Sequence, residues 1–430
     1  MDFYPKDYGA VSDGITNDTA ALQAAIDACH KAGGGRVILQ SGRTYLSSSL
    51  FLKSFVELHL ENGSTLLASG NLDDYYRPNQ PKAEGPVSTT GTPVTGKPSY
   101  VFLYAFQAEH VQITGNGRID GNGSAFVRRV SPYYVTGDFY PRPTLIYFED
   151  CRHLTFRDTI LCNVAFWTLH LGGCYDAFLD SLRILNPLDV ANSDGIDIDH
   201  TRMVRIVHCH VECADDCICM KNTLGNREYP HTRGVLVDGC TLISTSAALK
   251  IGTEGVDDFE DIQFSNCIIE DSNRGLSIQV RDAGCVRNVS FSHITVRTRR
   301  FADSWWGCAE PVAITAVDRD PEVPCGTIEN IRFDHIDCEG ENGVILYGLP
   351  GKIRDVDFAD SRITLCRHSK WPVDVYDLRP GHGMQLIHRP SVPFLSCAVS
   401  GLRLFNMTMH SWDGSPVEAE IHAAEDPLTV

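Results

Sequence analysis

Apolar and polar residues alternate along most of the chain in a short pattern that recurs. Each copy has two apolar positions two residues apart, followed by further apolar or small positions. Successive copies begin 23, 27, 31, 27, 27, 42, 25 and 46 residues apart. Alternation with a period of two is typical of β-strands with one buried face. The copies are Leu154–Phe156, Ala177–Leu179, Val204–Ile206, Val235–Val237, Ile262–Phe264, Val289–Phe291, Ile331–Phe333, Val356–Phe358 and Leu402–Leu404.

The spacing of these copies predicts the fold. Short strands that repeat about every 25 residues cannot bury their apolar faces alone, whereas stacked coils can. We therefore predict an all-β chain: a right-handed parallel β-helix in a single domain over residues 1–430, with coils at about 46–410 and a tail at 411–430. A β-propeller needs blades of about 40 residues, and a (β/α)8 barrel needs a helix in each repeat. The intervals of 42 and 46 residues fit either one coil with a long loop or two degenerate coils.

One helix is predicted in an N-terminal cap over about 1–45. Residues 17–19 offer N-cap oxygens, Ala20–Ala32 has helical apolar spacing, and three glycines follow. Such a helix would cover the open end of the coil stack. Segments 70–100, 124–142 and 300–325 are predicted to be long loops, which on a solenoid build a binding groove on one face.

Composition and charge narrow the possible partners. The 430 residues include 37 Lys+Arg and 55 Asp+Glu, a net charge of −18, which argues against a general nucleic-acid or anionic-membrane binder. No apolar run approaches the roughly 18 residues that span a bilayer. Met1–Pro5 lacks the basic and apolar regions of a secretory signal. We therefore expect a cytoplasmic location, or secretion if a leader was removed; the oligomeric state stays open.

The 16 cysteines are spread along the chain without the paired spacing of a disulfide scaffold. The closest group, at 213–219, lacks the second pair that a zinc site needs. Cys209, Cys240 and Cys267 instead share one position of the repeat. We therefore expect buried, reduced cysteines in an interior stack, where they act as small hydrophobic residues.

Acidic residues cluster in two adjacent coils. Asn192-Ser193-Asp194-Gly195 is followed by Asp215-Asp216-Cys217, and Asp194 and Asp215 lie 21 residues apart, close to one coil. Because stacked strands are about 4.8 Å apart, these carboxylates are expected to converge on one face. Like charges that close raise each other's pKa, so one group holds a proton while another stays ionised, as glycoside hydrolysis requires. Turn residues and calcium ligands are the alternatives.

The two motifs resemble glycoside hydrolase family 28, the polygalacturonase family of right-handed β-helices. The likeness extends to Asp7–Gly14 with Thr19–Ile26 in the cap and to Phe166–His170 ahead of the first motif. It implies an inverting hydrolase without cofactor or metal. The resemblance also implies a role for each residue. Asp215 would be the general acid, Asp194 and Asp216 would position and deprotonate the water, and Asn192 would bind substrate or orient a carboxylate.

Two further motifs of the family are replaced. Its Gly-His-Gly corresponds to Ser246-Ala247-Ala248 here, and its Arg-Ile-Lys to Ser277-Ile278-Gln279. The family's Arg and Lys neutralise the galacturonate carboxylate at the cleavage site. Their replacement leaves two possibilities for this site, a uronate held by substitute cations or a different sugar. Lys250 and Arg281 are the candidate substitutes, and Gln279 is a candidate sugar ligand.

Other candidate sugar contacts follow from side-chain chemistry. Trp305 and Trp306, near Glu310, would stack on sugar rings, or else pack on the coils. Lys221 would face the groove or solvent. His170 would line the groove or be a packed, hydrogen-bonded histidine. Asp377–Pro380, with Trp371 and Tyr376 nearby, would form the far wall of the groove.

Together these features predict a glycoside hydrolase that acts on a pectin-derived or related plant oligosaccharide, with long loops that block one side of the groove and enforce cleavage from an end. Two other classes stay open. One is a β-helical lyase or epimerase, in which Lys221 or Lys250 abstracts a proton next to a uronate carboxylate, often with calcium. The other is a non-catalytic glycan-binding solenoid.

Overall fold

The computed structural model describes residues 1–78, 96–127, 141–383 and 385–423. The chain divides into two compact units, Met1–Ala214 with Glu228–Pro230 and Asp215–Arg227 with His231–Val430. Residues 79–95 and 128–140 of two predicted loops lie outside the described residues. The single domain stays a prediction. In the described parts of the chain, no helix is long and apolar enough to cross a membrane.

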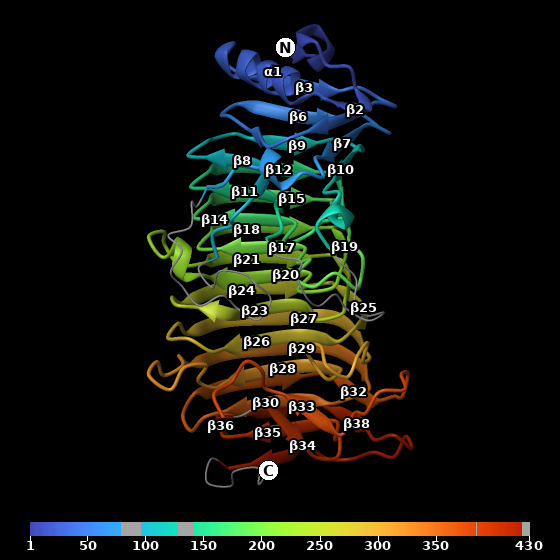
Figure 1. Ribbon diagram of the computed structural model, residues 1–430. Helices are drawn as coiled ribbons and strands as arrows, with labels where there is room; N and C mark the ends of the chain where they lie inside the picture. Colours follow the sequence, from blue (N-terminus) through green and yellow to red (C-terminus); the bar gives the residue numbers. More distant parts are fainter. Residues whose placement is uncertain (79–95, 128–140, 384, 424–430) are drawn as a thin grey trace. The chain divides into compact units, whose positions relative to one another are not determined.

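The first unit is a stack of parallel coils with three strand columns (Figure 1). One column contains β1 (Asp2–Phe3), β3 (Gly35–Leu39), β6 (Val56–Leu60), β9 (Gln112–Thr114), β12 (Arg152–Arg157), β15 (Tyr175–Asp180) and β18 (Arg202–Val207). The second contains β2 (Asp13–Asn17), β4 (Thr44–Ser47), β7 (Thr65–Ala68), β10 (Arg118–Asp120), β13 (Ile160–Cys162), β16 (Arg183–Leu185) and β19 (His210–Cys213). The third contains β5 (Leu50–Phe51), β8 (Val101–Phe106), β11 (Thr144–Glu149), β14 (Leu169–Gly172) and β17 (Ile196–Asp199).

The predicted capping helix is α1 (Thr19–Lys31), which buries Leu22, Ala25 and Ile26. Its start differs from the prediction in one respect. Asp18 occupies the N-cap position, yet its side chain makes no hydrogen bond to the helix. The Asp18 carboxylate instead accepts from the backbone nitrogens of Val11 (2.7 Å) and Ser12 (2.9 Å), so it ties the preceding loop to the helix.

The second unit also consists of parallel coils with three strand columns of its own (Figure 1). The first contains β21 (Arg233–Asp238), β24 (Phe259–Ser265), β27 (Val286–Thr298), β29 (Ile328–Gly340), β31 (Ile353–Ala359), β36 (Val399–Ser400) and β37 (Arg403–Phe405). The second contains β22 (Thr241–Ser244) and β25 (Ile268–Ser272), continues through the long β27 and β29, and ends in β32 (Arg362–Leu365) and β38 (Thr408–His410). The third contains β20 (Ile218–Asn222), β23 (Ala247–Gly255), β26 (Arg274–Val280), β28 (Glu310–Ala316), β30 (Val344–Gly348), β35 (Phe394–Cys397) and β39 (Glu420–His422).

Equivalent residues of the repeat stack inside the coils. Phe264, Phe291, Phe333 and Phe358 form a ladder with ring centroids 4.7, 4.9 and 4.2 Å apart. Val289 pairs directly with Ile331, and Phe358 with Leu404. Each long interval is therefore one coil with a long connection. The parallel β-helix predicted from the repeat is confirmed, and its hand follows from the right-handed crossovers that parallel strands adopt.

Three predicted boundaries are wrong. The segment 300–325 contains the strand β28, which is buried on both faces and so lacks the alternation that marks the other strands. The tail at 411–430 contains β39, and strands of the columns already lie inside the predicted cap, where β1 pairs with β3 and β3 with β6. β39 pairs with β35 as the last strand of its column, and β1 has only two residues, so the pattern at both ends is short and weak in the sequence.

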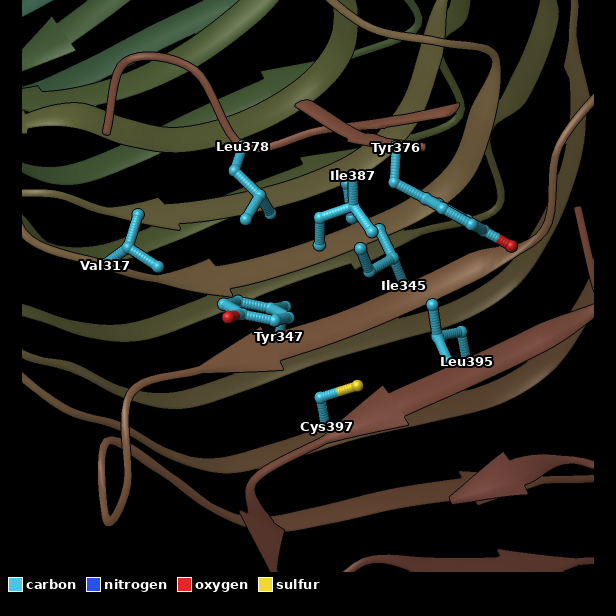
Figure 2. Packing of buried hydrophobic residues seen from close by; sticks show 9 residues of the cluster. Val317, Ile345, Tyr347, Tyr376, Leu378, Ile387, Leu395 and Cys397 are labelled. Atoms are coloured by element: carbon cyan, nitrogen blue, oxygen red, sulfur yellow. The ribbon is translucent and has the colours of Figure 1, made fainter. Parts of the chain in front are cut away.

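An antiparallel hairpin interrupts the last long coil of the second unit. It consists of β33 (Val375–Asp377) and β34 (Leu386–His388). Its side chains Tyr376, Leu378 and Ile387 pack with Ile345 and Leu395 of β30 and β35 in one buried cluster (Figure 2). The β33–β34 hairpin therefore covers the face of the third column that β28, β30 and β35 would otherwise expose.

Candidate active site

The first motif occupies a tight turn before β17 in the first unit. Asn192 adopts a left-handed backbone conformation (φ 57°), which asparagine tolerates better than most residues. Its side-chain oxygen accepts from Nη2 of the buried Arg142 at 2.9 Å. The same guanidinium donates to the carbonyls of Ala165 and Ala191, and Asp194 follows the turn with 2% exposure. Arg142 thus fixes the turn that presents both Asn192 and Asp194.

His170 lies in the neighbouring strand β14, on the face opposite Leu169 and Leu171. It is fully buried between the rings of Tyr147 and Trp167, at centroid distances of 4.7 and 4.9 Å. Its Nε2 contacts Asp199 Oδ2 at 3.1 Å. His170 is thus a packed, hydrogen-bonded histidine, which is one of the two alternatives predicted from the sequence. Its contact with substrate stays a prediction.

Asp199 anchors a small network that the sequence did not single out. Burial alone would raise the pKa of this carboxyl, but hydrogen bonds from His170 and His200 outweigh it and hold the pKa well below its usual range. His200 Nδ1 lies 2.9 Å from Asp199 Oδ1. Asp199 is therefore an ionised group that fixes the orientation of both imidazole rings. Its position two residues beyond Asp197 on the same strand face was the available signal.

The second motif occupies the turn before β20 in the second unit, and the next coil holds it in place. Ser244 Oγ donates to the backbone oxygen of Asp215 at 2.5 Å, and Cys217 N donates to the carbonyl of Ala247 at 2.9 Å. Ser246 Oγ lies 3.3 Å from Asp216 Oδ1. Both carboxylates are buried, with 5% of Asp215 and 1% of Asp216 exposed. The turn is thus rigid and its acids are shielded from bulk water.

Two lysines converge on Asp216. Lys250 Nζ lies 2.7 Å from Asp216 Oδ2, and Lys221 Nζ lies 3.8 Å from the same oxygen. Burial lowers the pKa of Lys250, but the adjacent Asp216 outweighs it and the pKa is raised. Lys250 is therefore a charged ammonium group, and Asp216 is its nearest carboxylate partner.

The charge network continues beyond the lysines. Lys221 Nζ also lies 3.2 Å from Glu254 Oε2, and Glu254 Oε1 lies 3.6 Å from Arg319. Burial favours the neutral form of Glu254, yet the two cations dominate and lower its pKa strongly. Sequence reasoning missed Glu254, Arg319 and Ser246. For Glu254 a signal existed, because it lies four residues after Lys250 and strand alternation puts both on one face.

Asp215 has the opposite electrostatic environment. Burial, followed by the charge of Asp216, raises its pKa to about 7, and this exceeds the opposing effects of Lys250 and Lys221. Asp215 therefore holds its proton to a higher pH than an ordinary aspartate does. Such a group next to a second carboxyl group can supply an acid and a base within one site.

Gln279 and Arg281, at the end of β26, have different surroundings. Gln279 is 1% exposed, and its Nε2 has no hydrogen-bond partner among residues that the structure describes. Arg281 is equally buried, but its guanidinium donates to the carbonyls of Val280, Thr315 and Leu378. These donors hold the carbonyl of Leu378, next to β33, to the coils. That Arg281 substitutes for a family cation stays a prediction.

Trp305 and Trp306 belong to the surroundings of the same hairpin. Arg379 Nη2 donates to the backbone oxygen of Trp305 at 2.7 Å, and the guanidinium lies 5.3 Å from the ring centre of Trp306. Trp305 is buried and Trp306 is partly exposed. Trp305 is therefore packed within the protein, which is the alternative to sugar stacking given above. Contact of Trp306 with a sugar stays a prediction.

The structure thus brings together Asp215, Asp216, Lys221 and Lys250 in the second unit, and Asn192, Asp194 and His170 lie in the first. Convergence of Asp194 with the Asp215–Asp216 pair stays a prediction from the 21-residue spacing. A parallel β-helix that carries one carboxyl group with a raised pKa beside a second one paired with lysine is an architecture suited to glycoside hydrolysis.

The comparison with protein families agrees with this class. The family model described as "Glycosyl hydrolases family 28" matches residues 75–301, more than half of the chain. The chain belongs to glycosyl hydrolase family 28. The resemblance seen in the two acidic motifs is thereby confirmed.

Individual relatives are distant. A probable polygalacturonase from Vitis vinifera is 26% identical over 310 residues, which cover 69% of this chain and 61% of that protein, less than two thirds of its length. An endo-polygalacturonase from Pectobacterium carotovorum subsp. carotovorum is 24% identical over 372 residues, or 83% and 86% of the two chains. The crystal structure of a hyperthermoactive exopolygalacturonase from Thermotoga maritima aligns with a TM-score of 0.70 at 19% identity, over 97% of this chain and 93% of that one. That likeness shows the fold.

Proposed function

We propose that this protein is an inverting glycoside hydrolase that cleaves a pectin-derived or related plant oligosaccharide. The observation that carries the proposal is the division of labour between two adjacent carboxyl groups. Asp215 has a pKa of about 7 and is available as an acid, while Asp216 is paired with Lys250 at 2.7 Å. Membership in family 28 and the polygalacturonase relatives support a pectic substrate.

In the proposed reaction Asp215 donates its proton to the glycosidic oxygen as the bond to the anomeric carbon breaks. Asp216, with Asp194, accepts a proton from a water molecule that attacks the anomeric carbon from the opposite face. Inverting enzymes usually hold acid and base about 6.5–9.5 Å apart, whereas Asp215 and Asp216 offer carboxylate oxygens within 4.8 Å of each other. Inversion is therefore proposed from the family resemblance, and the product anomer tests it. Asn192, held by Arg142, is placed to orient Asp194 or a sugar hydroxyl.

The surroundings of Asp216 disfavour two alternatives. A lyase or epimerase base must lose a proton near neutral pH, which requires a lowered lysine pKa, whereas the pKa of Lys250 is raised. A calcium ion at Asp216 would meet the ammonium group of Lys250, only 2.7 Å from the carboxylate oxygen. We therefore assign the chemistry to carboxyl groups and require neither cofactor nor metal.

The first experiment is a screen of defined pectic and non-pectic oligosaccharides with the full chain. We expect release of reducing sugar, and proton NMR at early times should show the product anomer inverted relative to the cleaved bond. A retained anomer would contradict the inverting mechanism. An unsaturated product that absorbs in the ultraviolet would favour the lyase, and no cleavage of any oligosaccharide would favour the glycan-binding solenoid.

We further propose that cleavage proceeds from a chain end. Lys250 of β23 is followed in register by Ser277 of β26 and Ala313 of β28. Ala313 already belongs to the cluster under the β33–β34 hairpin. A glycan that ran along this face would meet the hairpin within two coils of Lys250, and this leaves room for a terminal unit rather than a continuing chain.

This proposal predicts the product pattern of the wild-type protein. Early digests of a long oligosaccharide should contain one small product and substrates shortened by that unit, measured by mass spectrometry. The same oligosaccharide with both ends chemically capped should resist cleavage, while the uncapped one serves as the control. Internal fragments of many sizes from the capped substrate would overturn the assignment of exo action.

A further inference from the structure

Lys250 contacts the carboxylate of Asp216 directly. Its Nζ lies 2.7 Å from Asp216 Oδ2, and its side chain is 11% exposed. We propose that Lys250 is a positioning residue that orients Asp216 for the reaction, rather than a ligand for a uronate carboxylate. This inference rests on the proposed hydrolase function and assigns a role that the two acidic motifs do not contain.

The backbone explains why Lys250 reaches Asp216. In β23, Leu249 and Ile251 are fully buried, and alternation turns Lys250 to the other face. Lys250 pairs in register with Cys219 of β20, the strand that begins just after Asp216. Ser246, four residues earlier, contacts the other carboxylate oxygen at 3.3 Å. One coil therefore holds both oxygens of Asp216 and fixes the plane of the carboxylate.

The charges around Lys250 come from two strands. From β20 and the turn before it, Asp215, Asp216 and Lys221 face it, and Glu254 follows on β23 itself. The neighbouring strand β26 places the neutral Ser277 opposite it. Asp216 is the nearest anion, so the ammonium group stabilises negative charge on Asp216 more than on Asp215. This difference in distance favours the proton on Asp215, the proposed acid.

A role in binding a uronate would conflict with this contact. To reach a sugar carboxylate, Lys250 would have to leave Asp216, and a buried carboxylate would lose its closest counter-ion. Lys221 lies 3.8 Å from Asp216 and is also engaged by Glu254 at 3.2 Å. Both lysines thus pair with carboxylates of the protein. The inference therefore does not require a carboxylate on the sugar at the cleavage site.

The test compares Lys250→Met, Lys250→Arg and the wild type on oligogalacturonate and on its methyl-esterified form. Lys31→Met is the matched control, since Lys31 is exposed at the end of α1. For Lys250→Met we expect kcat to fall by about 10²–10³ on whichever substrate the wild type cleaves, with KM changed less than about threefold. Lys250→Arg keeps the positive charge and should recover at least about tenfold of that loss.

Two outcomes would overturn the inference. One is an unchanged kcat in Lys250→Met with KM raised only for the charged substrate, which would make Lys250 a uronate ligand. The other is a Lys250→Arg variant that is folded by circular dichroism yet as inactive as Lys250→Met. If Lys250→Met does not fold, Ser246→Ala replaces it, because loss of the second contact to Asp216 should also lower kcat and leave KM unchanged. A wild type that cleaves neither form, nor any oligosaccharide in the wider screen, refutes the hydrolase proposal itself, and the two failures are thus distinct.

Discussion

Replacing Asp215 by Asn is expected to lower the rate of hydrolysis by about 10²–10⁴ without unfolding the protein. Asparagine has nearly the same shape but has no proton to give to the leaving oxygen. The turn itself depends on the backbone oxygen of Asp215, which accepts from Ser244, and that contact is kept. The measurement is reducing-sugar release, with circular dichroism as the check on folding. Asp337→Asn, in an exposed ion pair with Arg362, is the matched control and should retain wild-type activity.

The same residue sets the expected pH dependence. A general acid must be protonated, so activity of the wild type should fall as pH rises through about 7, the pKa of Asp215. The raised pKa also means that the folded state binds this proton more tightly than the unfolded state, so stability is lost as pH rises from about 4 to about 7. Asp215→Asn should therefore melt at a higher temperature than the wild type at pH 8. A fully active variant, or one less stable at that pH, would contradict the assignment of Asp215.

The fold was predictable because the residues that stack in successive coils also recur at regular intervals in the sequence. Phe264, Phe291, Phe333 and Phe358 occupy one position of successive coils, and each shows the period of two around it. β28 was missed for the converse reason. Both of its faces are buried, one by the coil interior and the other by the β33–β34 hairpin, so its sequence has no alternation. A strand covered by a distant insertion cannot be recognised from its own pattern.

The site was predictable only as far as local motifs go. The pair Asp215–Asp216 stands out because it follows Asp194 at 21 residues, close to the length of one coil. The partner of Asp216 could not be predicted in this way, because Lys250 lies 34 residues away in the sequence. Whether Lys250 contacts a sugar or Asp216 depends on the register between coils. Arg281 shows the same limit. Its position near the Ser277–Gln279 motif suggested substrate, but the carbonyl of Leu378, 97 residues away, takes its guanidinium.

The hairpin that closes one end of the proposed substrate path depends on Arg274, a buried cation on β26. Arg274 is 1% exposed, and its guanidinium lies 3.0 Å from Asp377 of the hairpin and 3.5 Å from Glu310 of β28. Asp377 and Glu310 are both fully buried. Breaking a buried pair by removing one partner typically costs about 3–5 kcal/mol. Arg379 remains 2.8 Å from Asp377, so the charge that loses its compensation is that of Glu310.

Arg274→Met, which keeps the length of the side chain, is therefore expected to destabilise the second unit by about 3–5 kcal/mol, measured as the shift of its urea unfolding transition. Arg403→Met is the matched control, since Arg403 is 67% exposed in its pair with Asp357 and such surface pairs contribute about 0–1 kcal/mol. Equal losses in the two variants would show that burial of the network does not matter. Asp377 also accepts a hydrogen bond from Gly307 N, so it links the hairpin to the segment before β28. We therefore expect Arg274→Met to loosen the hairpin before the coils unfold. The hairpin is proposed to enforce exo action. At a low temperature, at which Arg274→Met remains folded, this variant should therefore release internal fragments from a capped oligosaccharide. The wild type should leave the same oligosaccharide intact.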